Sequence, residues 1–142
     1  MKRQRGQSAV EFALISPIIF LLIFAAIYGG AMFIQFMNYS NEARRIAREI
    51  AVVSTDKRKE KVDQYNGVAL GSFGTLYKVE LTTQLIKYSD DGTPDPVTDE
   101  SAYGTATDVH VRFDFDHGQE FPFGFPPRKF AASYQMKLES HD

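Results

Sequence analysis

Hydrophobic residues occur first as an unbroken run and then at helical spacing. Residues 12–34 carry no charged side chain. About 23 residues in a helix, each rising about 1.5 Å, can cross a hydrocarbon core of about 30 Å. Beyond this run, apolar residues such as Ala43, Ile46 and Ile50 recur with a helical period, and arginines lie on the opposite side. The pattern predicts a membrane-spanning helix that continues as an amphipathic helix to about Thr55.

The second half of the chain alternates between apolar and polar residues. The three alternating stretches are residues 79–85, 109–115 and 130–138, and a weaker one covers 68–70. Such alternation is typical of strands with one buried face. The charged run 56–61 is expected to be a solvated turn or a frayed helix extension, and residues 89–107 a turn and loop. The predicted fold class is α+β, with the long N-terminal helix packed on an antiparallel sheet of about three or four strands.

Composition narrows the function further. The chain has 142 residues, a net charge of −2 and no cysteine, so disulfides, zinc thiolates and thiol nucleophiles are excluded. No basic patch with interleaved aromatic residues indicates nucleic-acid binding. The three histidines lack the spacing of a metal site, and an acidic loop around Asp90 is better explained by solvation than by calcium. We therefore expect no enzyme, no cofactor and no metal.

Charges around the apolar run predict its orientation. Lys2, Arg3 and Arg5 precede it, and the positive-inside rule keeps such a flank in the cytoplasm and sends the rest of the chain across the membrane. Attraction to anionic lipid would hold the same residues at the cytoplasmic face. The run is too long for an ordinary cleaved secretory signal.

Gly6 and Glu11 distinguish this N-terminus from a plain anchor. A basic leader, Gly6, then Gln7-Ser8-Ala9-Val10-Glu11 and an apolar helix resemble the class III signal of type IV pilin-like proteins. With Pro17 and the Ala/Arg-rich continuation 41–48, the stretch is similar to TadE-like minor pilins of the Tad (tight adherence, Flp) pilus system. The resemblance covers about the first 50 residues. It implies a leader (1–6), a transmembrane and assembly helix (7–34) and an extracytoplasmic part (35–142).

The resemblance also implies how the segment is processed. A prepilin peptidase would cut between Gly6 and Gln7, where a residue without a Cβ lets catalytic groups approach the backbone. The freed amino group of Gln7, from its own or an adjacent subunit, would pair with Glu11, because an ionised carboxylate among packed apolar helices is costly without a partner. The alternatives are a flexible glycine at the membrane entry and an interfacial glutamate favoured by the helix dipole.

Two further features of the helix bear on assembly. Pro17 removes a backbone hydrogen bond and is expected to kink or fray the preceding turn. Ala25 with Gly29 and Ala26 with Gly30 form small-xxx-small pairs that let helix backbones approach. These pairs indicate contact with other pilins or with an inner-membrane assembly platform, although an Ala-rich segment produces them by chance as well.

Phe121, Phe123 and Phe125 lie in a proline-rich loop. They are expected either to cap the sheet or to form a patch for a partner. The sequence as a whole indicates a single-pass protein of the cytoplasmic membrane that contributes to the biogenesis or adhesion of a Tad/Flp pilus. A type II secretion pseudopilin and an uncleaved single-pass anchor with an external binding domain remain as alternatives.

Overall fold

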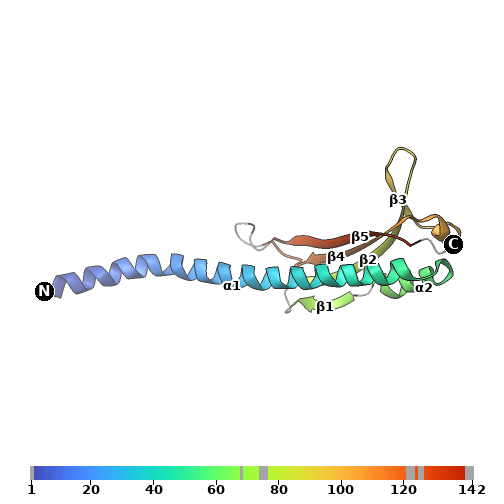
Figure 1. Ribbon diagram of the computed structural model, residues 1–142. Coiled ribbons are helices and arrows are strands. Elements are labelled where there is room, and N and C mark those ends of the chain that lie inside the picture. Colours follow the sequence, from blue (N-terminus) through green and yellow to red (C-terminus); the bar gives the residue numbers. More distant parts are fainter. Residues whose placement is uncertain (1, 68, 74–76, 121–123, 125–126, 140–142) are drawn as a thin grey trace. The chain divides into compact units, whose positions relative to one another are not determined.

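The protein has two helices, five strands and a short 3₁₀ helix among its described residues. A computed structural model describes residues 2–67, 69–73, 77–120, 124 and 127–139 (Figure 1). The elements are, in chain order, α1 (Lys2–Val52), α2 (Thr55–Tyr65), β1 (Ala69–Phe73), β2 (Tyr77–Tyr88), β3 (Pro94–Val97), η1 (Glu100–Thr105), β4 (Asp108–Asp116) and β5 (Lys129–Lys137). Two compact units, Met1–Gln35 and Phe36–Asp142, divide the chain within α1.

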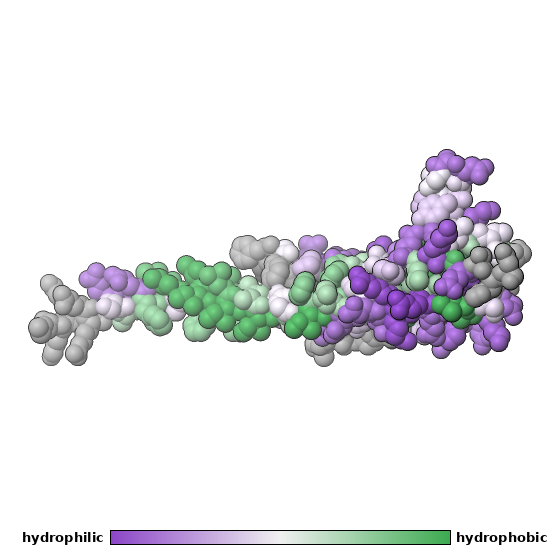
Figure 2. Space-filling model, viewed as in Figure 1, coloured by the Kyte–Doolittle hydropathy of each residue, from purple (hydrophilic) through white to green (hydrophobic). Residues whose placement is uncertain are grey.

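The first unit consists of α1 alone and exposes its large hydrophobic side chains. Phe12, Phe20 and Phe24 are 68%, 56% and 67% exposed, and hydrophobic residues gather over this part of α1 (Figure 2). Within the described residues, this is the one helix long and apolar enough to cross a membrane, and its most apolar window buries none of its residues. The predicted apolar helix is confirmed, and its composition fits a membrane anchor.

The second unit contains an open antiparallel sheet in the order β1-β2-β4-β5. The short strand β3 pairs with the last residues of β2, from Leu85 to Tyr88, beyond the part of β2 that pairs with β1. β1, β2, β4 and β5 pair in chain order, so these four strands form a meander. β3 and η1 are inserted between β2 and β4. The expected antiparallel sheet is confirmed.

One face of the sheet is buried, as the alternation predicts. Leu81 of β2 lies opposite Phe113 of β4, which lies opposite Ala132 of β5, and all three are almost completely buried. The neighbouring rows repeat this pattern, since a strand turns every second side chain to the same face.

The C-terminal part of α1 covers this face. Its buried residues are Ala43, Ile46, Ala47, Ile50 and Ala51. Near the start of this segment the Tyr39 ring lies 5.1 Å from the ring of Phe113 and 5.0 Å from that of Phe115, between ring centroids. Near its end, the backbone N–H of Glu139 donates to the carbonyl of Ala51 at 3.2 Å. The small alanines let the helix lie close to the sheet, so both elements bury their apolar surfaces.

The charged run after α1 corrects the sequence expectation. Residues 56–61 lie in the helix α2 instead of a turn or a frayed extension. Arg58 is only 3% exposed, and its Nη2 donates to the carbonyls of Val53 and Glu139, each at 3.2 Å. Burial lowers the pKa of this guanidinium. Packing of Arg58 and Val62 against the rest of the second unit gives α2 a buried side, which the run of charged residues does not reveal.

The expected loop 89–107 is also more regular than the sequence indicates. It contains β3 and η1, and the β2–β3 hairpin projects from the sheet (Figure 1). At its tip, Asp91 Oδ1 accepts a hydrogen bond from the Thr93 backbone at 3.0 Å, and Gly92 has a φ of 81°. A side-chain acceptor and a glycine with positive φ define a tight turn, so a segment rich in proline and aspartate still forms a short strand.

Candidate functional site

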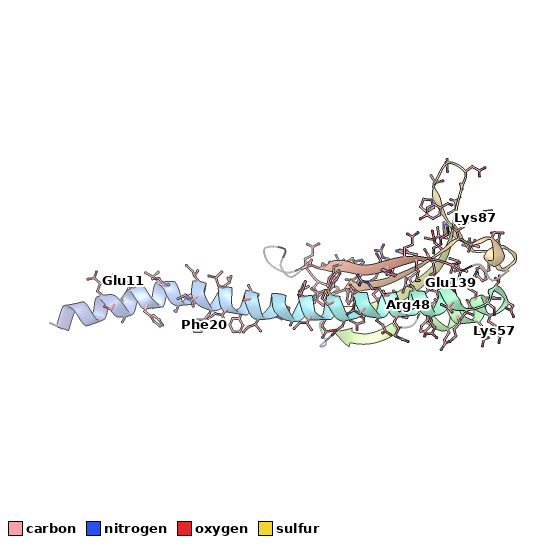
Figure 3. All side chains as sticks on the ribbon, in the orientation of Figure 1. Glu11, Phe20, Arg48, Lys57, Lys87 and Glu139 are labelled. Carbon is pink, nitrogen blue, oxygen red and sulfur yellow. The ribbon has the colours of Figure 1, made fainter. Side chains whose placement is uncertain are left out.

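Gln7 and Glu11 lie on the same side of the first turns of α1. The Gln7 side-chain Nε2 donates a hydrogen bond to Glu11 Oε1 at 3.3 Å. Residues four apart on a helix face each other, so the acid lies directly beside the residue that cutting after Gly6 would place at the N-terminus. Both side chains are exposed (Figure 3 labels Glu11). The structure thus brings these two sequence-predicted residues together in the uncut chain.

The backbone at Gly6 is helical. α1 begins at Lys2 and includes Lys2, Arg3, Arg5 and Gly6. A peptidase needs an extended substrate backbone, so cutting at this position requires the first turns of α1 to unwind. Glycine assists this step, because it costs a helix roughly 1 kcal/mol relative to alanine.

Pro17 lies inside α1 without ending it, since the helix is assigned continuously from Lys2 to Val52. A proline cannot donate to the carbonyl four residues earlier, which here belongs to Ala13. The Ser16 hydroxyl donates to that carbonyl at 3.4 Å. Ser16 therefore supplies a weak substitute for the missing backbone bond, a role that its position before a proline in an apolar helix could have indicated.

The small residues of α1 leave open space on the helix surface. Ala25 and Gly29 are half-buried, whereas Ala26 and Gly30 are exposed. A Cβ built on Gly30 would meet no atom within 4 Å. Nothing within the described chain therefore requires glycine at this position, and a contact with another helix would supply a reason for it.

A cluster of polar side chains joins the C-terminal part of α1 to α2. Glu49 accepts hydrogen bonds from Lys61 Nζ at 2.8 Å and from the Tyr65 hydroxyl at 2.9 Å, and its carboxylate also pairs with Arg45, which pairs in turn with Glu42. The Lys61 bond, and then the Tyr65 bond, lower the pKa of Glu49. Helical spacing along α1 predicts the pairs of Arg45 with Glu42 and Glu49. The contacts of Glu49 with Lys61 and Tyr65 could not be predicted in this way, because they depend on α2 lying beside α1.

The remaining sequence candidates are the phenylalanines of the proline-rich loop and the acidic side chains. Phe121, Phe123 and Phe125 lie outside the described residues. Among the residues that are described, no three His, Asp or Glu side chains lie close enough together to hold a metal ion. Loop acids instead form turns, as where Asp116 Oδ1 accepts a hydrogen bond from the Gly118 backbone at 2.7 Å.

A comparison with known protein families identifies the helical segment. Residues 6–48 match the family model described as TadE-like protein. Over this segment the chain is similar to TadE-like proteins. The match begins at Gly6 and includes Glu11, Pro17 and the small residues of α1, which confirms the resemblance and supports a minor pilin-like role in a Tad pilus system. No curated protein and no solved structure matches the chain.

The TadE-like match covers most of α1 and no other element of the fold. The matched residues end at 48, within the part of α1 that covers the sheet. They include the apolar segment and most of the buried residues of the amphipathic segment, but neither α2 nor any strand. The TadE-like similarity therefore applies to α1. No comparison covers the sheet, so only its geometry describes it.

Proposed function

We propose that this TadE-like protein is a minor pilin or pilus assembly protein with a structural and not a catalytic role. A prepilin peptidase cuts it between Gly6 and Gln7 on the cytoplasmic side. The mature protein stays in the cytoplasmic membrane through α1, with its sheet outside, until it contributes to the biogenesis or adhesion of a Tad/Flp pilus. Its partners are the peptidase, other pilins, the inner-membrane assembly platform and membrane lipid.

The observation that carries this proposal is the hydrogen bond from Gln7 Nε2 to Glu11 Oε1 at 3.3 Å. Cutting after Gly6 converts the backbone N–H of Gln7 into an α-amino group that is largely protonated at neutral pH. A cation then replaces a peptide bond within one helical turn of the carboxylate. Once the first turns of the helix form again after the cut, the two charges lie within one helical turn of each other.

Exposure along α1 supports the assembly step. Most of the large hydrophobic side chains between Phe12 and Ile34 are 45–71% exposed, so they require lipid or other helices around them. When helices replace lipid, an unpaired Glu11 carboxylate would lose its hydration without compensation. Pairing with an N-terminal amino group, its own or that of a neighbouring subunit, offsets this cost and fixes the axial position of one helix against the next.

Co-expression with a prepilin peptidase tests the cut. Gly6→Leu should abolish cutting, whereas Gly30→Leu, the same substitution elsewhere in α1, should leave it intact. Edman sequencing or intact mass gives the N-terminal residue of each variant. Cutting of Gly6→Leu at the wild-type rate would exclude Gly6 as the recognised residue.

Substitution of Glu11 separates cutting from assembly. Glu11→Gln keeps the size and hydrogen-bonding shape of the side chain but removes its charge, and Glu11→Ala removes both. Each variant should be cut normally, and each should reduce surface piliation in a strain that depends on this chain. Normal piliation with both variants would disprove the pairing between Glu11 and the amino terminus.

A further inference from the structure

The outer edge of β5 is a long strand edge without a partner among the described residues. β5 covers Lys129–Lys137, and the sheet order places it at the end, paired with β4 alone. Neither a proline nor a bulge interrupts its register with β4, which runs without a shift from Asp108↔Lys137 to Asp116↔Lys129. Proteins commonly protect such an edge with prolines, bulges, very short strands or lysines, and β5 has only the lysines at its two ends.

The ladder shows which backbone groups point outward. In an antiparallel pair, opposed residues alternate between those that exchange hydrogen bonds and those that do not. Just beyond the two ends of the pairing, Leu138 N–H donates to the Thr107 carbonyl at 2.8 Å and His117 N–H donates to the Arg128 carbonyl at 2.9 Å. The even-numbered residues of β5 therefore bond to β4. The backbone groups of Ala131, Ser133 and Gln135 point to the open edge, together with those of the two terminal lysines.

Positive charge gathers at the C-terminal half of this edge. The Arg44 guanidinium lies over the ring of Tyr134 in β5, 5.4 Å from its centroid. Arg48 follows one helical turn later on α1, and Lys137 is exposed at the end of β5. None of the three forms an ion pair with a carboxylate in the part of the chain that the structure describes.

The acids at this end compensate only part of that charge. Asp108 lies directly opposite Lys137 in the strand pairing and accepts a hydrogen bond from Gln135 Nε2 at 3.2 Å, and Glu139 is exposed. At the other end, by contrast, Lys129 Nζ pairs with Asp116 Oδ2 at 3.1 Å. At the C-terminal end three basic side chains thus stand against the two acids Asp108 and Glu139, so this end of the edge keeps an excess of positive charge.

We propose that the open edge of β5 binds an extended, acidic strand of another protein, which continues the sheet. Backbone hydrogen bonds to Ala131, Ser133 and Gln135 provide the docking, as in other complexes formed by strand addition. Acidic side chains near Lys137 and below Arg44 and Arg48 provide the specificity. This inference goes beyond the processing proposed above and is independent of the cut after Gly6.

A second copy of this chain is a poor occupant of the edge. Antiparallel pairing of two β5 strands about Ser133 would place Lys137 of each copy opposite Lys129 of the other. Like charges directly opposite each other destabilise a strand pair. A partner with acidic residues at those positions avoids this repulsion, and it also neutralises the arginines on α1.

A selection of peptides on the full-length chain in lipid nanodiscs tests the proposal. The probe is a displayed library of random nine-residue peptides. We expect enrichment of proline-free sequences with acidic residues, and we expect a selected peptide to slow hydrogen exchange at the amides of Ala131, Ser133 and Gln135. No enrichment, enrichment without acidic residues, or protection at other amides would overturn the proposal.

Variants of the chain locate the binding energy. Ser133→Pro removes an outward donor without removing a bond to β4 and should abolish binding. Arg44→Ala with Arg48→Ala should weaken binding about tenfold. Lys57→Ala with Lys87→Ala, which loses the same charge at exposed positions elsewhere (Figure 3), should bind like wild type. Equal affinity for all these proteins would contradict the assignment, and circular dichroism checks that each one is folded.

The absence of native cysteine allows a direct test of self-pairing. In a pair of β5 strands centred on Ser133, the two Ser133 Cα atoms would lie about 5.5 Å apart, within disulfide range. Ser133→Cys should therefore remain monomeric under mild oxidation if the edge is kept for another protein. Efficient formation of a disulfide-linked dimer would show that the occupant is a second copy.

Discussion

The two units of this protein contain the same types of hydrophobic residue under opposite conditions. In Met1–Gln35 the phenylalanines of α1 are mostly exposed, whereas in Phe36–Asp142 the phenylalanine Phe113 is completely buried. α1 belongs to both units, so its two parts differ in what surrounds them and not in secondary structure. The second unit completes its core with its own sheet, while the first needs a membrane or other helices to do so.

The largest expected effect on stability distinguishes a buried phenylalanine of the second unit from an exposed one of the first. Phe113→Ala should destabilise the second unit by about 3–5 kcal/mol, because it opens a cavity between the sheet and Tyr39. Phe20→Ala, at a residue that is 56% exposed and labelled in Figure 3, should leave that unfolding transition unchanged. Thermal unfolding of the full-length protein in detergent, followed by near-ultraviolet circular dichroism, compares the two. Equal destabilisation by both substitutions would refute the division into two units.

The next effect concerns the buried cation of α2. Arg58→Ala leaves the carbonyls of Val53 and Glu139 without their donor and should cost about 2 kcal/mol of unfolding free energy. Arg58→Lys should recover only part of this loss, because one ammonium group cannot reproduce the shape of the guanidinium. Lys57→Ala, at the exposed neighbour, is the control and should unfold like wild type. Denaturant titration gives the three midpoints, and an unchanged midpoint for Arg58→Ala would show that its two hydrogen bonds are dispensable.

A smaller effect depends on pH. Because the pKa of Glu49 is lower in the folded protein, its contribution is complete above the pKa of the unfolded chain and is lost as the pH falls through the folded value. Its side chain is 33% exposed, so the contribution should stay below about 1 kcal/mol. Glu49→Gln should unfold at a lower midpoint than wild type at pH 7, and this difference should shrink as the pH falls toward 3.

Glu60→Gln is the matched control for this pH dependence, because Glu60 is an exposed acid on α2 without a hydrogen bond from Lys61. It should keep the wild-type difference between pH 3 and pH 7. A Glu49→Gln profile parallel to that of wild type over the whole range would mean that Lys61 and Tyr65 do not stabilise the folded carboxylate.

The smallest effect on stability is expected at Gly30. Gly30→Ala meets open space within the chain, and alanine favours a helix by at most about 1 kcal/mol over glycine. The unfolding of the second unit should not change. If helix backbones approach each other at this position in the pilus, the same variant should reduce piliation. A variant with a less stable second unit but normal piliation would contradict both expectations.

Local patterns in the sequence predict most of the fold. Strict alternation around Val79, Val111 and Ala132 indicates the three main strands, and helical spacing through Ile46 and Ile50 indicates the buried side of α1. The sequence missed α2 because its charged residues dominate the run 56–61, while the carbonyl that binds Arg58 belongs to Glu139 at the far end of the chain. It missed β3 because two prolines flank Asp95, and prolines usually argue against a strand.

The candidate site shows a similar division. The spacing of Gly6 and Glu11 is visible in the sequence alone, because it depends only on the residue types and on the number of residues between them. Side-chain contacts such as the bond between Gln7 and Glu11, or between Ser16 and the Ala13 carbonyl, depend on the helix that places them. The outward groups of β5 could not be predicted at all, since they depend on the register with β4 and on the hydrogen bonds at its two ends.

The central claim is that a peptidase turns an anchored helix into an assembly element by creating an amino terminus beside Glu11. The most direct measurement is the intact mass of the wild-type chain purified from membranes of cells with and without a prepilin peptidase. Our account predicts a chain that begins at Gln7 only when the peptidase is present. A chain that still begins at Met1 in both membranes would contradict it.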